Sequence, residues 1–346
     1  MARQPKRILF QGLGGAGQRH LRIFRSLLPD AEMFAWRRAR KTPLLKPDLT
    51  VDSSGTLEER YAIRMVSSIE EGYALSPDLV VIATPSSLHA EAVLEAVHRG
   101  VDVFVEKPAA ISVDQSRAIE SAVRAGGVDF FVSFQRRFHP LVQRMRSVLA
   151  SGTLGEIMSV RINVASHVPD WHAYEDFHDL YACRADLGGG VLRTESHELD
   201  LVGWLFGMPQ RVSSVLGCRG PHRLGVEDSA DLLLDYGDYA IQVSLCFMQR
   251  HQERRIVING RDGWLDCDLL LQRLEVGRHS DGDVEVVGEA VDMGTLFTAQ
   301  AEYFLDGFEH RSTEYLEAIR NLTSLVEAVD AAAGKGWAAS DRGQAG

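Results

Sequence analysis

The sequence predicts a mixed α/β protein with a doubly wound parallel sheet in its first part and an antiparallel sheet in its second. Three observations support this fold class. Apolar strands and amphipathic helices alternate about six times between residues 6 and 134. Strands then follow one another without intervening helices between residues 212 and 276. The length of 346 residues is too great for one ordinary core, so two domains are expected.

The composition excludes several classes of partner. With 45% hydrophobic and 25% charged residues, it is typical of a globular protein. The net charge of −11 argues against nucleic acid or an anionic membrane as the main partner. The apolar stretch near the N-terminus is too short for a signal peptide, and no later run reaches the length of a membrane span. The cysteines form no CxxC pattern, which predicts free thiols in a reducing cytoplasm and argues against a metal site.

The first expected strand, residues 6–11, ends in a glycine-rich turn with the pattern GxGxxG. In a dinucleotide site Gly12 allows a tight turn, Gly14 lets a pyrophosphate approach the backbone, and Gly17 lets the next helix pack closely. The N-terminus of that amphipathic helix would favour phosphate groups. The alternative is a plain glycine-rich turn. The cofactor contacts expected here are Gly12, Gly14, Gly15, Ala16 and Gly17.

The second expected strand, residues 32–36, is followed by basic residues. A site that prefers NAD usually has an acidic residue there to hold the ribose 2′-hydroxyl, whereas this chain has Arg37 and Arg38. A guanidinium group suits a 2′-phosphate, so NADP is favoured and NAD stays possible. The alternative is a solvated basic turn.

Further strands of the parallel sheet are expected at residues 63–66, 78–83, 103–105 and 129–134. Ser67 and Ser68 are placed to cap the helix that follows strand 63–66, and Ser86 or Ser87 the helix that follows strand 78–83. The loop from Thr84 to His89 follows a strand and falls at the same sheet edge as the glycine-rich turn. Thr84, Pro85 and His89 are therefore expected to line the cofactor, although His89 fits a surface position equally well.

The sequence VDVFVEKP, residues 101–108, places charged residues at the carboxyl end of a buried strand. Open α/β sheets bind their ligands at this edge, so Lys107 is the leading candidate for a catalytic residue. The alternative is a solvated strand-to-helix turn. A helix over 112–125 and the strand over 129–134 complete this half. The domains are expected to span residues 1–134 and 135–333, joined near 135–138.

The second half begins with a helix expected over 139–151 and a strand over 157–165. The segment 167–178 is then rich in histidine, aromatic and acidic residues. A metal site is one interpretation, but the spacing of these residues is not diagnostic of one. A loop that binds a polyhydroxylated substrate is favoured, with His167 and Trp171 as contacts. Arg184 is a candidate partner for a phosphate or nucleotide group of that substrate.

Three glycines at 188–190 precede a helix that is expected to end at Gly207. Thr194, His197 and Glu198 share one face of that helix by their spacing. A histidine and a lysine in one cleft form an acid/base pair, so His197 is a second catalytic candidate. The alternative is a structural histidine.

The remaining pattern predicts an antiparallel sheet and two closing helices. Strands are expected at 212–216, 229–236, 240–247, 254–259, 263–267 and 269–276. Helices are expected near 297–309 and 312–332, and the tail 334–346 is expected to fray. One face of the sheet must pack against the helices, and the other face is available for a subunit interface.

The segments GLGGAGQRH, ATPSSLHAE, VDVFVEKP, FQRRFHP and LGGG…SHELD occur in this order over nearly the whole chain. Together they resemble the Gfo/Idh/MocA family, which includes glucose–fructose oxidoreductase and inositol dehydrogenase. The resemblance implies a Rossmann domain, a C-terminal domain with a large, mostly antiparallel open sheet, a nicotinamide cofactor and a sugar or cyclitol substrate. It also implies a homodimer or homotetramer formed through the open sheet.

The resemblance also implies roles for single residues. Lys107 would act in catalysis and contact the substrate. Glu106 and Pro108 would shape the nicotinamide pocket, with the bond between Lys107 and Pro108 often cis. In the motif FQRRFHP, Gln135 would contact the cofactor and Arg136 the substrate.

One position departs from the family pattern. Relatives commonly carry an aspartate three or four residues before the histidine, and this chain has Thr194 three residues before His197. Thr194 then becomes a candidate substrate contact. Glu195 lies about 100° around a helix from Thr194, so it cannot simply substitute, whereas Glu198 shares the face. The departure affects either the substrate class or the catalytic competence.

Three functions are compatible with the sequence. The first is an NAD(P)-dependent oxidoreductase for a sugar, sugar nucleotide or cyclitol, with Lys107 and His197 as acid/base groups. The second is a non-catalytic regulator that binds a dinucleotide or sugar. The third is a redox-neutral lyase or glycosidase that uses a tightly bound cofactor. Intact Glu106, Lys107 and His197 favour an enzyme over the regulator.

Overall fold

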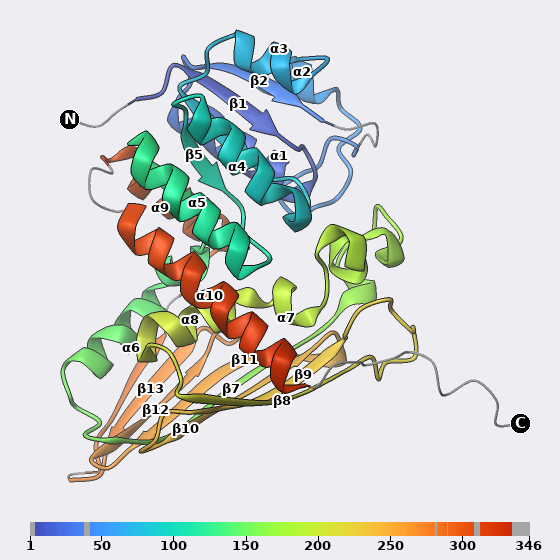
Figure 1. Ribbon diagram of the computed structural model, residues 1–346. Helices are drawn as coiled ribbons and strands as arrows, with labels where there is room; N and C mark the ends of the chain where they lie inside the picture. The colour runs from blue at the N-terminus through green and yellow to red at the C-terminus, as the bar shows by residue number, and fades with distance from the viewer. Residues whose placement is uncertain (1–3, 38–41, 281, 289, 308–311, 334–346) are drawn as a thin grey trace, which may run out of the picture. The chain divides into compact units, whose positions relative to one another are not determined.

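The computed structural model describes residues 4–37, 42–280, 282–288, 290–307 and 312–333 (Figure 1). These residues form two compact units. The first contains the chain up to Phe138, the short segment His172–Glu175 and the later segment Asp292–Thr323. The second contains His139–Trp171, Asp176–Val291 and the chain from Ser324. The tail expected to fray, residues 334–346, lies outside the described residues.

The first unit contains a parallel sheet of six strands in the order β3-β2-β1-β4-β5-β6. The predicted doubly wound fold is therefore confirmed. The strand order reverses between β1 and β4, which is where sheets of this type bind ligands. Its strands are β1 (Arg7–Gln11), β2 (Glu32–Trp36), β3 (Ile63–Met65), β4 (Leu79–Ile82), β5 (Asp102–Val105) and β6 (Phe130–Val132).

The helices of the first unit begin where the chain offers caps. The Ser68 side chain accepts the N–H of Glu71 at the start of its helix, as predicted. Neither Ser86 nor Ser87 caps the following helix, because both lie in a 3₁₀ turn that precedes it. The helices are α1 (Gly15–Leu27), α2 (Leu57–Tyr61), α3 (Ile69–Ala74), α4 (His89–His98), α5 (Val113–Gly126), α9 (Met293–Leu305) and the first part of α10 (Ser312–Ala332).

The Phe104 ring lies at the centre of the core of this unit. It stacks on Phe131 at 4.9 Å and meets the edges of Phe24 at 5.3 Å and Phe304 at 5.6 Å, measured between ring centroids. These four rings come from β5, β6, α1 and α9. Helix α9, almost 200 residues after β5 in the chain, is therefore part of the first core.

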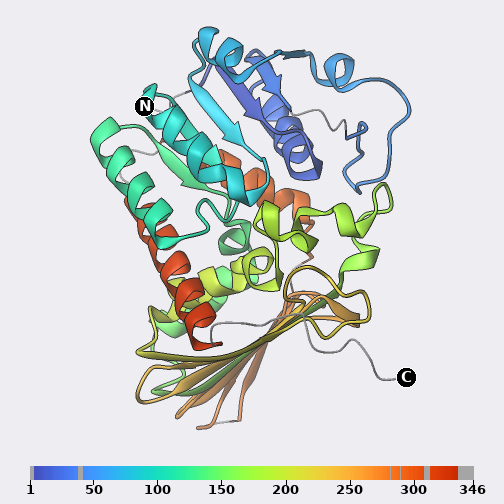
Figure 2. The same cartoon turned by 45° about the vertical axis from the view of Figure 1, so that its right-hand side comes forward.

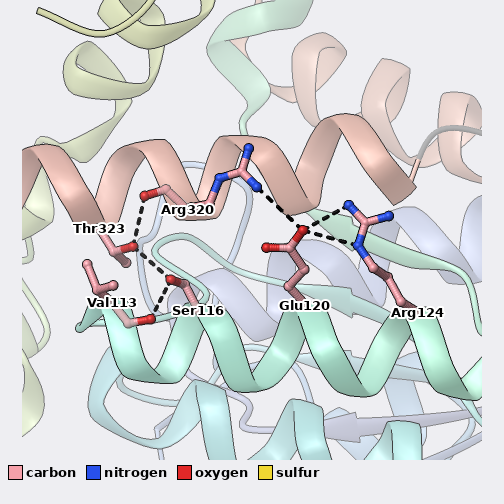
Figure 3. A network of polar contacts seen from close by, with 6 residues as sticks. All are labelled: Val113, Ser116, Glu120, Arg124, Arg320 and Thr323. Carbon is pink, nitrogen blue, oxygen red and sulfur yellow. Dashed lines mark hydrogen bonds and ion pairs between the residues drawn. The ribbon is translucent and has the colours of Figure 1, made fainter.

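Helix α10 packs along α5 within the same unit (Figure 3). The buried Thr323 hydroxyl lies 3.0 Å from the Ser116 hydroxyl, which itself donates to the Val113 carbonyl at 2.8 Å. Nearer the surface, the Glu120 carboxylate contacts both Arg124 and Arg320. The buried hydroxyl pair ties the two helices more effectively than the exposed ion pairs do, because water screens the latter.

The second unit contains a sheet of eight strands in the order β14-β13-β12-β11-β7-β10-β9-β8. Among the described strands of this second sheet, only β7 and β10 pair in parallel, so the predicted mostly antiparallel sheet is confirmed. Its strands are β7 (Ile157–His167), β8 (Arg211–Gly217), β9 (Ser229–Asp235), β10 (Ala240–Cys246), β11 (Met248–Gly260), β12 (Gly263–Asp268), β13 (Arg273–Arg278) and β14 (Val284–Gly288).

Helices α6 (Pro140–Ala150), α7 (Val191–Thr194) and α8 (Ser196–Phe206) lie on one face of this sheet (Figure 2). Along β7, Val160, Ile162 and Val164 are buried, while the alternating Arg161 and Asn163 are exposed. The face that carries Arg161 and Asn163 is therefore the one that these helices do not cover.

The structure of the second unit differs from several sequence expectations. The helix expected from 191 to 206 is two helices, α7 and α8, that meet at Glu195. The strand expected at 269–276 begins only at Arg273, because the Asp268 carboxylate accepts two N–H groups and forms a turn. Strand β14 was not expected from the sequence.

Candidate functional site

The glycine-rich turn requires glycine at two of its three motif positions. Gly12 has a φ of +90°, and a Cβ there would lie 2.6 Å from the Ala83 carbonyl oxygen. A Cβ on Gly17 would lie 2.2 Å from the carbonyl oxygen of Gly12. Gly14 is different, since a Cβ there would meet no described atom within 4 Å. The open space at Gly14 suits the approach of a ligand to the backbone.

Helix α1 begins beside this open space. Its N-cap is Gly14, which offers no side-chain hydrogen bond, and its first turn has no acidic residue. The free N–H groups and the positive end of the helix dipole are therefore available to an anion. A Cβ on Gly15 would lie 3.3 Å from the hydroxyl oxygen of Tyr174, so this side chain borders the turn. The sequence did not predict that Tyr174 lies beside Gly15, because its segment, 167–178, is interpreted there as a substrate-binding loop.

Two further loops reach the carboxyl edge of the parallel sheet. After β2, the Arg37 guanidinium lies 4.0 Å from the Glu58 carboxylate, and Arg38 lies outside the described residues. After β4, the chain passes through Thr84 and Pro85 into a 3₁₀ turn.

The side chain of His89 is buried, and both ring nitrogens face backbone carbonyls. Nδ1 lies 2.8 Å from the Pro108 oxygen and Nε2 lies 2.7 Å from the Thr84 oxygen. Burial lowers the pKa of His89, and its two backbone hydrogen bonds oppose that effect. His89 therefore joins the loop after β4 to the loop after β5. The surface alternative is wrong for this residue, and its contact with the cofactor stays a prediction.

Glu106 follows β5 and its carboxylate is buried among donors. Nε2 of His20 lies 2.6 Å from Oε1, and the Ser133 hydroxyl donates to the same oxygen at 3.2 Å. Oε2 accepts the backbone N–H of Lys107 at 3.1 Å. Burial alone would raise the pKa of Glu106, but the hydrogen bond and charge of His20, followed by the charge of Lys107, lower it to about 2. Glu106 is therefore ionised at neutral pH.

Lys107 itself is partly exposed and is linked to Pro108 by a cis peptide bond, as the resemblance implied. Its position after β5 is the predicted one, at the edge of the sheet that also carries the glycine-rich turn. The solvated-turn alternative does not explain the buried carboxylate that immediately precedes it.

The motif FQRRFHP begins with a 3₁₀ turn over Gln135–Phe138. Gln135 is buried, and the Arg136 guanidinium is 3.9 Å from the sulfur of Met293. Arg137, for which no role was predicted, is buried and pairs with Glu314 at 3.0 Å. All of these residues belong to the first unit.

The second unit holds the other catalytic candidate. Thr194 ends α7, and His197 lies in the first turn of α8; both are buried. The single helix predicted to carry them is wrong, because the chain forms two helices that meet at Glu195. Lys107 and His197 belong to different units.

Arg254 on β11 binds the carboxylates that flank this break. Its Nη2 donates to Glu195 at 2.8 Å, and its Nη1 donates to Glu198. Burial would lower the pKa of Arg254, but the two carboxylates raise it above its usual range. Glu198, considered from the sequence as a substitute for the family aspartate, is thus committed to Arg254.

The other substrate candidates of the second unit lie in the segment after β7. Nδ1 of His167 is 2.8 Å from the Asp170 carboxylate, and Trp171 packs against Phe247 with centroids 5.2 Å apart. Arg184 is bound by Asp186 through two hydrogen bonds of 3.0 and 2.5 Å. Within the described part of the chain, no group of three or more His, Cys, Asp or Glu side chains is arranged to hold a metal ion.

The open glycine-rich turn, the uncapped α1 and the strand order define a dinucleotide-binding Rossmann domain. Residues 6–134 match the family model "Oxidoreductase family, NAD-binding Rossmann fold". Residues 142–266 match the model of the GFO/IDH/MocA C-terminal domain. The chain therefore belongs to the Gfo/Idh/MocA family of oxidoreductases.

Curated relatives include several dehydrogenases. The chain is 30% identical over 197 residues to trans-1,2-dihydrobenzene-1,2-diol dehydrogenase of Bos taurus, a match that spans 56% of each chain. It is 26% identical over 270 residues to D-xylose 1-dehydrogenase (NADP(+)) 2 of Haloferax volcanii, covering 75% of this chain and 80% of that protein. The first match thus spans little more than half of the bovine protein.

The fold is similar to that of solved structures. Levoglucosan dehydrogenase in complex with NADH and levoglucosan has a TM-score of 0.76 at 18% identity, covering 95% of this chain and 97% of that one. UDP-N-acetylglucosamine 3-dehydrogenase from Acidithiobacillus ferrooxidans has a TM-score of 0.73 at 18% identity, covering 94% and 97%. At these identities the likeness concerns the fold.

The turn fits the nicotinamide dinucleotide that the family implies. Gly14 leaves space at the N-terminus of α1, and that helix end has no side-chain cap to compete with a phosphate. We expect Gly12–Gly17 to hold the pyrophosphate.

The glycine positions give a prediction that separates binding from folding. Gly14→Ala is expected to change the free energy of unfolding by less than about 1 kcal/mol and to raise the Kd for NADPH at least about tenfold. Gly17→Ala is expected to lower the free energy of unfolding by about 1–3 kcal/mol, because its Cβ meets the Gly12 carbonyl. Urea unfolding and fluorescence titration measure both quantities. Unchanged affinity in Gly14→Ala would contradict this assignment.

Proposed function

We propose that this protein transfers a hydride between a nicotinamide cofactor and a carbon of a sugar, sugar nucleotide or cyclitol. The observation that carries the proposal is the position of Lys107, at the carboxyl edge of the parallel sheet and next to the buried Glu106 carboxylate. A charged side chain there can donate to the oxygen on a reacting carbon. The names of the relatives, which act on a diol and on sugars, support a substrate with hydroxyl groups on a ring or sugar chain.

The proposed chemistry assigns one role to each candidate. The bound nicotinamide supplies or accepts the hydride. Lys107 donates a hydrogen bond to the substrate oxygen, and His197 exchanges the proton of the substrate hydroxyl. On oxidation the C–H electron pair leaves with the hydride and the O–H proton passes to the base, so the carbonyl forms without net charge. Further substrate contacts are proposed for Arg136, His167, Trp171, Arg184 and Thr194.

NADP is the favoured cofactor and NAD stays possible. Arg37 follows β2, and a guanidinium at this position suits a 2′-phosphate. The relative from Haloferax volcanii is named for NADP, whereas levoglucosan dehydrogenase was solved with NADH. The remaining cofactor contacts proposed are Thr84, Pro85, His89, Glu106, Lys107 and Gln135.

A redox-neutral reaction is the second candidate. The chain is 28% identical over 201 residues to 2,7-anhydro-N-acetylneuraminate hydratase of Escherichia coli, covering 56% of this chain and 52% of that protein. In that case cofactor would copurify with the protein, and substrate would be consumed without a net change in NADPH.

We also propose a homodimer or homotetramer that forms through the uncovered face of the second sheet. This face carries Arg161, Asn163 and Gln242, which are exposed. Sedimentation equilibrium of the full chain that shows a monomer would contradict this proposal.

A cytoplasmic location is proposed because the four cysteines, all within the described residues, form no disulfide. Within the described chain, no helix is both long and apolar enough to cross a membrane.

Lys107→Ala tests the catalytic role. It is expected to lower kcat about 1000-fold, because the donor to the substrate oxygen is lost, while the Kd for NADPH changes little. Steady-state absorbance and fluorescence titration measure the two quantities. Lys6→Ala, at an exposed lysine, is the control. Weaker cofactor binding with normal turnover at saturating cofactor would exclude the role.

Arg37→Asp combined with Arg38→Ala tests the cofactor preference. The double variant is expected to weaken NADPH binding about 100-fold and NADH binding about threefold or less, since only NADPH has the 2′-phosphate. Calorimetry with both cofactors gives the two ratios. Arg117→Asp, on the exposed surface of α5, serves as the charge control. Equal losses for both cofactors would show that these arginines do not bind the 2′-phosphate.

A further inference from the structure

His20 lies in the middle of α1, and its side chain is fully buried. No role was predicted for His20, although it ends the segment GLGGAGQRH. Its Nε2 is bound to Glu106, and its Nδ1 has no hydrogen-bond partner among the described residues. Among the described residues, the carboxylate that precedes Lys107 is therefore the one hydrogen-bond partner of this ring.

The Glu106 carboxylate connects His20 to the backbone of Lys107. On one side, His20 and Ser133 donate to Oε1 at 2.6 and 3.2 Å. On the other side, Oε2 accepts the Lys107 N–H at 3.1 Å. A carboxylate held at one oxygen by two donors has a fixed plane, so the position of the second oxygen is fixed as well.

The donors are themselves held in place. The His20 ring packs edge-on against Phe104 at 5.1 Å and against Phe297 at 5.9 Å. The Ser133 hydroxyl accepts the side-chain amide of Gln300 at 2.9 Å, and Gln300 is fully buried. The network therefore joins α1 and α9 to the residues that directly follow β5 and β6, around one carboxylate.

The chain is also held directly after Lys107. The Pro108 carbonyl is bound by Nδ1 of His89 at 2.8 Å. The backbone of Lys107 thus lies between two fixed points, one on each side, and each depends on a buried histidine. Stability alone does not account for a buried charged group here, since apolar residues of the same volume often stabilise a core equally well.

We propose that His20 is a positioning residue for Lys107. It fixes the Glu106 carboxylate, and this carboxylate binds the backbone N–H of Lys107. This inference rests on the proposed function in so far as Lys107 is the group positioned. It adds a residue of the phosphate-binding helix to the reaction site of the first unit.

Three variants test the inference. His20→Leu removes the donor, His20→Gln keeps an N–H near the position of Nε2, and His98→Leu is the control at the end of α4. His20→Leu is expected to lower kcat about 100-fold, as a small displacement of a catalytic group does, with an unchanged Kd for NADPH. His20→Gln is expected to stay within about fivefold of the wild type.

A second readout does not depend on activity. Hydrogen exchange of the Lys107 amide, followed by mass spectrometry, is expected to quicken at least about tenfold in His20→Leu and to stay near the wild-type rate in His20→Gln. Unchanged exchange in His20→Leu, or equal losses of kcat in both variants, would overturn the inference. Wild-type protein without hydride transfer would instead refute the proposed function, and the exchange data would still decide whether His20 fixes this peptide.

Ser133→Ala covers the case in which His20→Leu does not fold. This change removes the second donor to the same oxygen and leaves the core volume nearly intact. It is expected to lower kcat about fivefold with cofactor affinity unchanged. A kcat equal to that of the wild type, with unchanged exchange at Lys107, would overturn the inference.

Discussion

The ionised carboxylate of Glu106 is the constraint on which the rest of the first unit's site depends. A buried charge is stable only when donors surround it. Here the donors come from α1, from Ser133 directly after β6 and from the Lys107 backbone. Since α1 also begins at the open glycine-rich turn, the same helix that would receive the phosphates fixes the loop that carries the lysine. Helix α1 therefore contributes both to the expected cofactor site and to the position of Lys107.

The second unit uses a buried charge in a similar way. Arg254 joins Glu195 and Glu198 across the break between α7 and α8. His197 lies between these two carboxylates in the chain, so the start of its helix is fixed to β11. The family resemblance implies an aspartate at position 194, and Thr194 provides no carboxylate there. The Glu195 and Glu198 carboxylates, which are close to it in sequence, are bound to Arg254. The proposed acid/base chemistry therefore rests on Lys107 and His197.

The sequence predicted what local patterns encode. Alternating strands and helices gave the parallel sheet, and the GxGxxG spacing gave a turn in which Gly12 and Gly17 are required. What it missed depends on residues distant in the chain. His20 and Glu106 are 86 positions apart, and Ser133 and Gln300 are 167 apart. The break at Glu195 has a similar origin, since its partner Arg254 lies on a strand 59 residues later, and helical spacing alone predicted one continuous helix.

The most direct test of this account is whether a hydride reaches a substrate carbon. NADPH carrying deuterium at both hydrogen positions of nicotinamide C4 would be incubated with a panel of keto sugars, oxidised inositols and keto nucleotide sugars, and the products analysed by mass spectrometry. The account predicts one deuterium on the carbon that becomes the alcohol in the wild type, and loss of labelled product in Lys107→Ala. Product that forms without deuterium would contradict direct hydride transfer.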